Sequence, residues 1–138
     1  MASQYYVFFR SFATFITFIR NFFGFADKIP YLCNMEQSEV IDNIKTIAQK
    51  ILPENSSLYL YGSRARGDAR ADSDWDLLVL IDKDKVTGDD YDMVYPFFEY
   101  GVDIGQYIST HVYTKKQWQS WTFLPFYHNV EHDKIVLK

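Results

Sequence analysis

The stretch that decides the fold is LYLYGSRARGDARADSDWDLLVLID, which runs from Leu58 to Asp82. It predicts a short apolar strand over 58–61, a Gly-Ser turn, a basic loop and a second apolar strand over 75–81. Two carboxylates, Asp74 and Asp76, lie where the second strand opens. Because side chains alternate between the two faces of a strand, residues two apart project the same way. The two carboxylates are therefore expected to converge on one place at the end of the sheet.

Paired carboxylates on a rigid strand indicate a cation site. Like charges held close together raise each other's pKa and destabilise the fold unless a cation compensates them. Oxygen ligands favour a hard ion, and Mg²⁺ is the usual one where phosphates supply the remaining ligands. Asp74 and Asp76 are accordingly predicted to bind metal.

The Gly-Ser turn before them has the features of a phosphate-binding loop. Gly62 would let the backbone approach an anion closely, and a helical turn after it would present free N–H groups. Ser63 adds a hydroxyl, and Arg64 and Arg66 add guanidinium groups whose geometry suits phosphate. These four residues are the predicted nucleotide-binding residues.

Together, Gly62-Ser63, Arg66-Gly67 and Ser73-Asp74-Trp75-Asp76 resemble the signature of the minimal nucleotidyltransferases, which are small members of the DNA polymerase β superfamily. The resemblance covers the chain from about Met35 to its end. It implies an α/β (α+β) nucleotidyltransferase fold, similar to the polymerase β palm. In that fold a small mixed sheet carries helices mainly on one face, and the catalytic carboxylates lie on two neighbouring strands.

The same resemblance implies a reaction and its residues. A nucleoside monophosphate, with AMP from ATP the favoured case, would pass to a hydroxyl acceptor while Asp74 and Asp76 hold two Mg²⁺ ions. In the superfamily a third carboxylate completes the metal site from a neighbouring strand. Asp103, in a strand start expected at 102–104, is the candidate, and Glu99 is close enough in sequence to compete. Asp74, Asp76 and Asp103 are thus the predicted catalytic residues.

The acceptor is not specified by the motif. The resemblance implies an antitoxin that pairs with a helical HEPN-type RNase toxin and neutralises it by adding AMP to a tyrosine or by direct binding. An aminoglycoside-type nucleotidyltransferase is the enzymatic alternative, although those proteins usually carry an added helical domain. A catalytically inert binding module with the same fold is the third interpretation.

Composition limits the alternatives. The 138 residues suit one domain with a sizeable core, and the net charge of −4 argues against stable nucleic-acid binding, which usually needs a basic excess. Cys33 is the single cysteine, so an intramolecular disulfide cannot form and a reducing, cytoplasmic setting is expected.

Residues 1–34 form an aromatic-rich extension to the nucleotidyltransferase domain expected over 35–138. The extension holds eight of the twelve phenylalanines. Arg10 and Arg20 interrupt its apolar run, which makes it a poor membrane span. Its helical spacing would allow an amphipathic helix on a membrane surface or a partner. Alternatively, translation begins naturally at Met35 and the extension is not native.

Further elements follow from apolar periods and capping signals. They are a helix from Ser38, as N-cap, to Pro53; a helix from 87 or 89 to 95, before Pro96; a strand over 107–113 with a helix from Thr114; and a short edge strand over 135–137.

Overall fold

The sheet of this protein has four strands in the order β3-β2-β1-β4. They are β1 (Ser57–Tyr61), β2 (Trp75–Ile81), β3 (Ile108–Thr114) and β4 (Ile135–Val136). β1 is antiparallel to β2 and to β4, whereas β2 and β3 are parallel. The sheet is therefore mixed, and the chain has the α/β architecture expected from the sequence. The expected edge strand near the end of the chain is confirmed.

The structure, a computed structural model, describes residues 35–138. The interpretations of the extension over 1–34, including the amphipathic helix and Cys33, lie outside the described residues. Five helices accompany the strands in the described part: α3 (Gln37–Ile51), α4 (Ser63–Arg66), α5 (Gly88–Asp103), α6 (Lys115–Gln119) and α7 (Pro125–Asp133). None of the helices within 35–138 has both the length and the apolar character needed to cross a membrane.

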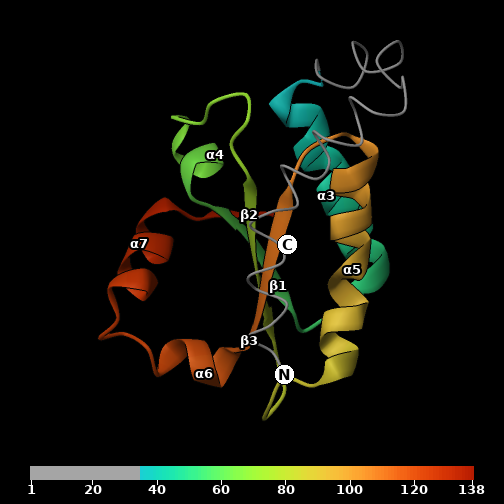
Figure 1. The fold of residues 1–138 in the computed structure, drawn as a ribbon. Helices are drawn as coiled ribbons and strands as arrows, with labels where there is room; N and C mark the ends of the chain where they lie inside the picture. The colour runs from blue at the N-terminus through green and yellow to red at the C-terminus, as the bar shows by residue number, and fades with distance from the viewer. Residues whose placement is uncertain (1–34) are drawn as a thin grey trace, which may run out of the picture. The chain divides into compact units, whose positions relative to one another are not determined.

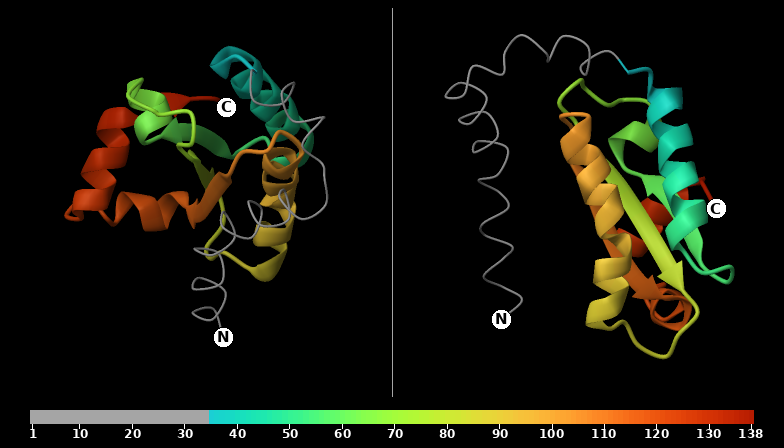
Figure 2. Two further views of the ribbon diagram at one scale, coloured as in Figure 1. Left: turned by 45° about the horizontal axis from the view of Figure 1, so that its top comes forward. Right: turned by 90° about the vertical axis from the view of Figure 1, so that its right-hand side faces the viewer.

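The helices form layers on the two faces of the sheet. The two long helices, α3 and α5, lie side by side on one face, and the short helices α6 and α7 lie on the other (Figures 1 and 2). Because β2 lies between two strands and is covered on both faces, six of its seven residues are buried. The exception is Asp76, which lies at the open end of the strand.

Apolar side chains pack the sheet against both layers. On the α3 face the helix buries Val40, Ile44 and Ala48, which recur every four residues and so form one stripe. On the other face a second cluster contains the buried side chains of Leu78, Leu80, Trp118 and Val130. These two layers hold β2 rigidly, and with it the carboxylate at its start.

Helix α5 differs from the prediction. It does not end before Pro96 but runs through it to Asp103, so the strand start expected at 102–104 is wrong. Proline removes one helical N–H, which leaves the carbonyl of Asp92 without its donor. Asp92 is exposed, so water can bond that carbonyl. Val94 and Phe97, on either side of the proline, are buried and keep both halves of the helix against the sheet.

The helix caps agree with the prediction in one case and differ in another. Thr114 is the N-cap of α6, and its hydroxyl accepts a hydrogen bond from the Gln117 N–H at 3.0 Å, as expected. Helix α3 begins two residues earlier than predicted, with Glu36 rather than Ser38 as its N-cap. Ser38 lies inside the first turn.

Asp90, at the start of α5, is expected to make the stability of the fold depend on pH. Its side chain is buried, and its carboxylate accepts hydrogen bonds from Lys83 Nζ at 2.8 Å, from the Thr87 N–H at 2.8 Å and from Thr87 Oγ1 at 2.9 Å. The Lys83 ammonium, followed by the Thr87 donors, holds the pKa of Asp90 below its ordinary value. The stabilisation is therefore present above the unfolded-state pKa and is lost as the pH falls through the folded-state pKa.

We predict that Asp90→Asn lowers the free energy of unfolding by about 1–3 kcal/mol at pH 7, because a charged acceptor is lost. The difference from the wild type should narrow once the pH falls below about 4, because the unfolded carboxyl then protonates before the folded one and favours unfolding. Urea unfolding of both proteins between pH 7 and pH 3 measures this difference in the free energy of unfolding. Asp89→Asn, at the exposed neighbouring position, is the control. An Asp90→Asn deficit that stays constant with pH would contradict the prediction.

Candidate functional site

The centre of the site is a close approach between Gly62 and Asp76. Tyr61, the last residue of β1, is the register partner of Asp76 on β2, so Gly62 comes directly beside that carboxylate. Gly62 has φ +75° and ψ −156°, and a Cβ at this position would lie 2.6 Å from Asp76 Oδ2. Only glycine fits both the backbone angles and the space. The turn therefore places the start of α4 against the carboxylate, at the end of the sheet where β2 begins (Figure 1).

The pKa values of both predicted carboxylates are raised. Burial raises the pKa of Asp76, and the neighbouring Asp74 raises it further. Asp74, an exposed residue just before β2, is only partly desolvated, and this raises its pKa, with an added contribution from Asp72. The charged forms are therefore disfavoured in the protein alone, and a cation that binds between them would relieve the repulsion.

The donor set fits a hard cation that is shared with a ligand. Within residues 35–138 there is no group of three or more His, Cys, Asp or Glu side chains arranged to hold a metal ion. Asp74 and Asp76 would therefore supply carboxylate oxygens, and phosphate oxygens or water would have to complete the coordination. This is the ligand pattern that Mg²⁺ adopts in phosphate-binding sites.

Arg64 holds the loop that leads to the carboxylates. Its guanidinium donates to the Ser73 carbonyl at 2.9 Å and to the Ala71 carbonyl at 3.3 Å, and it lies 4.6 Å from the ring centroid of Trp75. Partial burial lowers its pKa, and the carboxylates of Asp72 and Asp74 oppose this. In this structure Arg64 acts on the loop, so its predicted contact with phosphate stays a prediction.

Arg66 connects α4 to the C-terminal end of α7. It makes ion pairs with Asp68 at 3.2 Å and with Asp133 at 2.6 Å, and these partners raise its pKa. Asp133 also contacts His132 Nδ1 at 2.9 Å. No local signal pointed to Asp133, because 67 positions separate it from Arg66 and only the tertiary fold joins them. To bind phosphate, Arg66 would have to exchange one of these carboxylates.

We predict that Arg64→Lys loosens the loop over 67–74. A lysine cannot donate to two carbonyls in a fork or stack on Trp75 as a guanidinium does, so we expect a loss of about 1–2 kcal/mol in the free energy of unfolding. The rate of hydrogen exchange of the loop amides should be higher in Arg64→Lys than in the wild type. Arg70→Lys is the matched control, because Arg70 is exposed and its ion pair with Asp72 is exposed too. Equal effects of the two substitutions would contradict the role given to Arg64.

The structure does not bring the third predicted carboxylate into the site. Asp103 is the last residue of α5 and is exposed, and Glu99 is also exposed on the same helix. Neither forms a three-carboxylate cluster with Asp74 and Asp76 in the described residues. The reason is that α5 continues past Pro96, so the residues that were expected to begin a strand are the last residues of the helix.

The residue that β3 places beside Asp76 is Ser109. It is the register partner of Asp76, and His111 follows two positions later on the same face. The sequence predicted the strand over 107–113 but not its register against β2. Alternation along the strand indicates that Ser109 and His111 share a face. Only the fold shows that Ser109 lies opposite Asp76 and His111 opposite Leu78.

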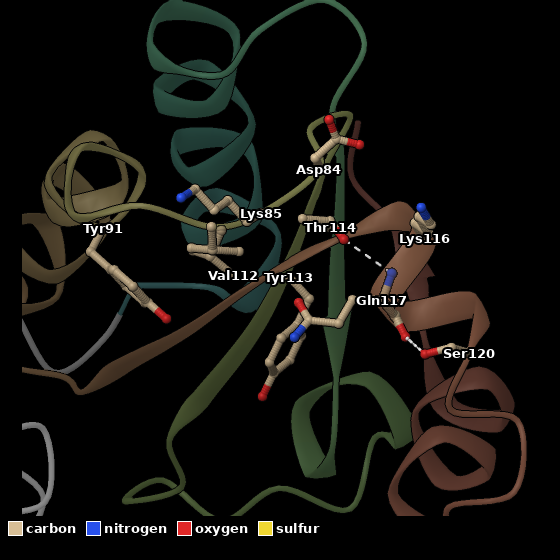
Figure 3. Close-up of a pocket in the computed structure, with 10 residues that line it drawn as sticks. Asp84, Lys85, Tyr91, Val112, Tyr113, Thr114, Lys116, Gln117 and Ser120 are labelled. Carbon is tan, nitrogen blue, oxygen red and sulfur yellow. Dashed lines mark hydrogen bonds between the residues drawn. The ribbon is translucent and has the colours of Figure 1, made fainter.

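A hollow elsewhere on the molecule contains none of the predicted site residues. It has a volume of about 780 Å³ and lies where β2 and β3 end, among Tyr91, Val112, Thr114 and Gln117 (Figure 3). The register pairs Ile81 with Thr114 at this end of the strands, whereas Asp76 pairs with Ser109 near the other end. The hollow and the carboxylate pair are therefore separate features.

Comparison with known protein families agrees with this geometry. Residues 41–131 of the 138 match the nucleotidyltransferase domain family. The chain belongs to this family. The match includes the Gly62 turn, α4 and both carboxylates, and it identifies the protein as a nucleotidyltransferase. No curated protein matches the chain significantly.

Two solved structures resemble this nucleotidyltransferase. One is a toxin–antitoxin crystal structure with AMP-PNP, with 16% identity, a TM-score of 0.51, and coverage of 71% of this chain and 72% of that one. The other is a candidate nucleotidyltransferase from Sulfolobus solfataricus, with 24% identity, a TM-score of 0.51, and coverage of 72% of this chain and 80% of that one. At these identities the likeness supports the fold.

Proposed function

We propose that this nucleotidyltransferase transfers AMP from ATP to a hydroxyl acceptor and depends on Mg²⁺ held by Asp74 and Asp76. The observation that carries the proposal is the approach of Gly62 to Asp76, where a Cβ would lie 2.6 Å from the carboxylate oxygen. It brings a turn suited to phosphate and a carboxylate pair suited to a cation to the same place. A nucleoside triphosphate and a divalent cation could then be bound together.

The residues of the turn and of α4 would have different roles in nucleotide binding. The backbone of Gly62 and Ser63, with the Ser63 hydroxyl, would bind the β- and γ-phosphates at the start of α4. Arg66 would stabilise charge on the leaving pyrophosphate once it releases Asp68 or Asp133. Arg64 would act mainly by holding the loop in position, as its bonds to Ala71 and Ser73 indicate.

The reaction is an in-line displacement. The acceptor oxygen forms a bond to the α-phosphorus of ATP, the bond from that phosphorus to the pyrophosphate oxygen breaks, and the acceptor hydroxyl loses its proton. A bound divalent cation would neutralise charge on the phosphates and make the acceptor hydroxyl more acidic. Asp74 and Asp76 would hold that cation, because the carboxylates alone would repel the phosphate chain.

For the acceptor, we propose a tyrosine of a HEPN-type toxin partner. Residues 36–138 form one compact unit, and within these residues there is no added helical domain that would enclose a small acceptor such as an aminoglycoside. A protein acceptor would bring its own binding surface. A similar fold in a toxin–antitoxin structure that contains AMP-PNP is consistent with this choice.

The test combines the purified chain, ATP, Mg²⁺ and a purified HEPN-type toxin as the partner. We expect release of pyrophosphate that requires all four components, and mass spectrometry should find AMP on a tyrosine of the partner. Release with an aminoglycoside in place of the partner would assign the small-molecule activity instead. ATP binding by calorimetry without any pyrophosphate release would show an inert module.

A further inference from the structure

The face of β3 that borders Asp76 carries a hydroxyl and an imidazole. Ser109 lies opposite Asp76 in the register of the two parallel strands, and His111 lies opposite Leu78. Neighbouring strands are about 4.8 Å apart, and residues two apart share a face. Asp76, Ser109 and His111 therefore form a continuous group on one surface of the sheet.

The two β3 side chains contact each other. Ser109 Oγ lies 3.3 Å from His111 Nε2. The His111 ring is stacked on Tyr113, with centroids 6.4 Å apart, and lies at the same distance from the Tyr61 ring. These two aromatic neighbours hold the imidazole with one nitrogen directed at the serine, and thus toward the side of Asp76.

The proposed transfer requires a base that the carboxylates do not readily provide. The acceptor hydroxyl must give up a proton, while Asp74 and Asp76 would both be occupied by a cation. Asp103, the third predicted catalytic carboxylate, is exposed at the end of α5. Among the described residues on this surface, His111 is the histidine that borders the pair through Ser109.

We propose that Ser109 and His111 form a proton relay for this nucleotidyltransferase, with His111 as the final base. The inference rests on the proposed function. As the acceptor oxygen bonds to the α-phosphorus and pyrophosphate leaves, the acceptor proton passes to Ser109 Oγ, and the Ser109 proton passes to His111 Nε2. Ser109 ends neutral, and His111 becomes an imidazolium that later loses its proton to solvent.

The surroundings of His111 suit this role. Burial lowers its pKa, so the ring is neutral at pH 7 and has a free nitrogen to accept a proton. The titratable side chains that contact the ring are the phenols of Tyr61, from β1, and Tyr113, from β3. Both phenols are uncharged at neutral pH, so neither would trap the imidazolium as a permanent ion pair.

The kinetic test compares variants at the two positions. His111→Gln should lower kcat for pyrophosphate release by about 100-fold, with little change in the KM for ATP, because general bases contribute on the order of 10²–10⁴. It should also remove the decline in rate toward acidic pH. Ser109→Asp in the His111→Gln protein places a carboxylate opposite Asp76 and should restore part of the rate. His128→Gln, at an exposed position on α7, is the matched control.

A second measurement does not need turnover. The chain has three histidines, so the ¹³Cε1 signals can be assigned by single substitution. Binding of Mg²⁺ with a non-hydrolysable ATP analogue should shift the His111 signal, leave His128 unchanged, and have no effect on His111 in the Asp76→Asn protein. An unshifted His111 signal with nucleotide bound, or an unchanged kcat in His111→Gln, would overturn the relay alone. No nucleotide binding by the wild type would overturn the proposed function as well.

Discussion

Asp76→Asn is expected to abolish nucleotidyl transfer, with a fall in kcat of about a thousandfold or more. The substitution keeps the shape of the side chain but removes the negative charge that the proposed cation requires, and charge stabilisation of phosphoryl transfer depends on that cation. Pyrophosphate release with saturating ATP and Mg²⁺ measures the effect. Calorimetry of the same protein should show that Mg²⁺ no longer strengthens ATP binding.

The same substitution is expected to leave the fold intact or to stabilise it. The folded-state pKa of Asp76 is raised by burial and by Asp74, so the charged form is penalised in the folded protein. The native state then binds more protons than the unfolded state, and stability falls as the pH rises through this range. Asparagine carries no charge, so without Mg²⁺ its Tm at pH 7 should equal or exceed that of the wild type. A large fall in Tm would instead mean that Asp76 is a structural residue.

The control for both effects is Asp92→Asn, which removes a carboxylate from an exposed position on α5. It changes the net charge by the same amount but lies outside the site. Its kcat should stay within about twofold of the wild type, since surface substitutions have small effects. Loss of activity in Asp92→Asn as well would show that net charge, rather than the site, controls the rate.

Gly62→Ala is expected to damage both stability and binding. With φ +75° and ψ −156°, Gly62 occupies a backbone region that is essentially restricted to glycine, and a side chain there costs about 1–3 kcal/mol. The added methyl group would also meet Asp76 Oδ2 at 2.6 Å, so either the turn or the carboxylate must move. We expect at least a tenfold loss in affinity for Mg²⁺ with ATP, measured by calorimetry, together with a lower Tm.

Gly67→Ala separates the backbone effect from the contact with Asp76. Gly67 ends α4 in the left-handed region, with φ +82° and ψ 12°, and nothing lies within 4 Å of the position of an added Cβ. It should lose about 1 kcal/mol of stability and keep its affinity for nucleotide. If Gly67→Ala lost affinity as much as Gly62→Ala, the approach of Gly62 to Asp76 would not be the feature that matters.

The course of the chain around the site could be read from local signals. Apolar runs on either side of a Gly-Ser turn predicted β1 and β2, and the strand over 107–113 was predicted from its alternation. Asp74 and Asp76 were predicted to act together because residues two apart on a strand must share a face. Each of these statements concerns residues that are close in sequence, where the backbone alone fixes the geometry.

The end of α5 shows where local signals fail. Pro96 and Gly101 indicated a break, and Asp103 was placed at a strand start. In the structure Val94, Phe97 and Gly101 are buried on one side of the helix, and this packing outweighs the cost of one proline. Because burial is a property of the whole fold, the local sequence could not show that the helix continues.

The sequence by itself determined the family of this protein, the positions of its four strands and of helix α3, and the succession of a glycine turn and two carboxylates. Only the tertiary structure decided which residues surround that pair: Asp133 of α7 pairs with Arg66, the loop carbonyls accept from Arg64, and Ser109, which contacts His111, lies opposite Asp76. The physical reason is register. A strand's pattern tells which side chains share a face, but its alignment against a neighbouring strand depends on contacts that accumulate along the whole sheet.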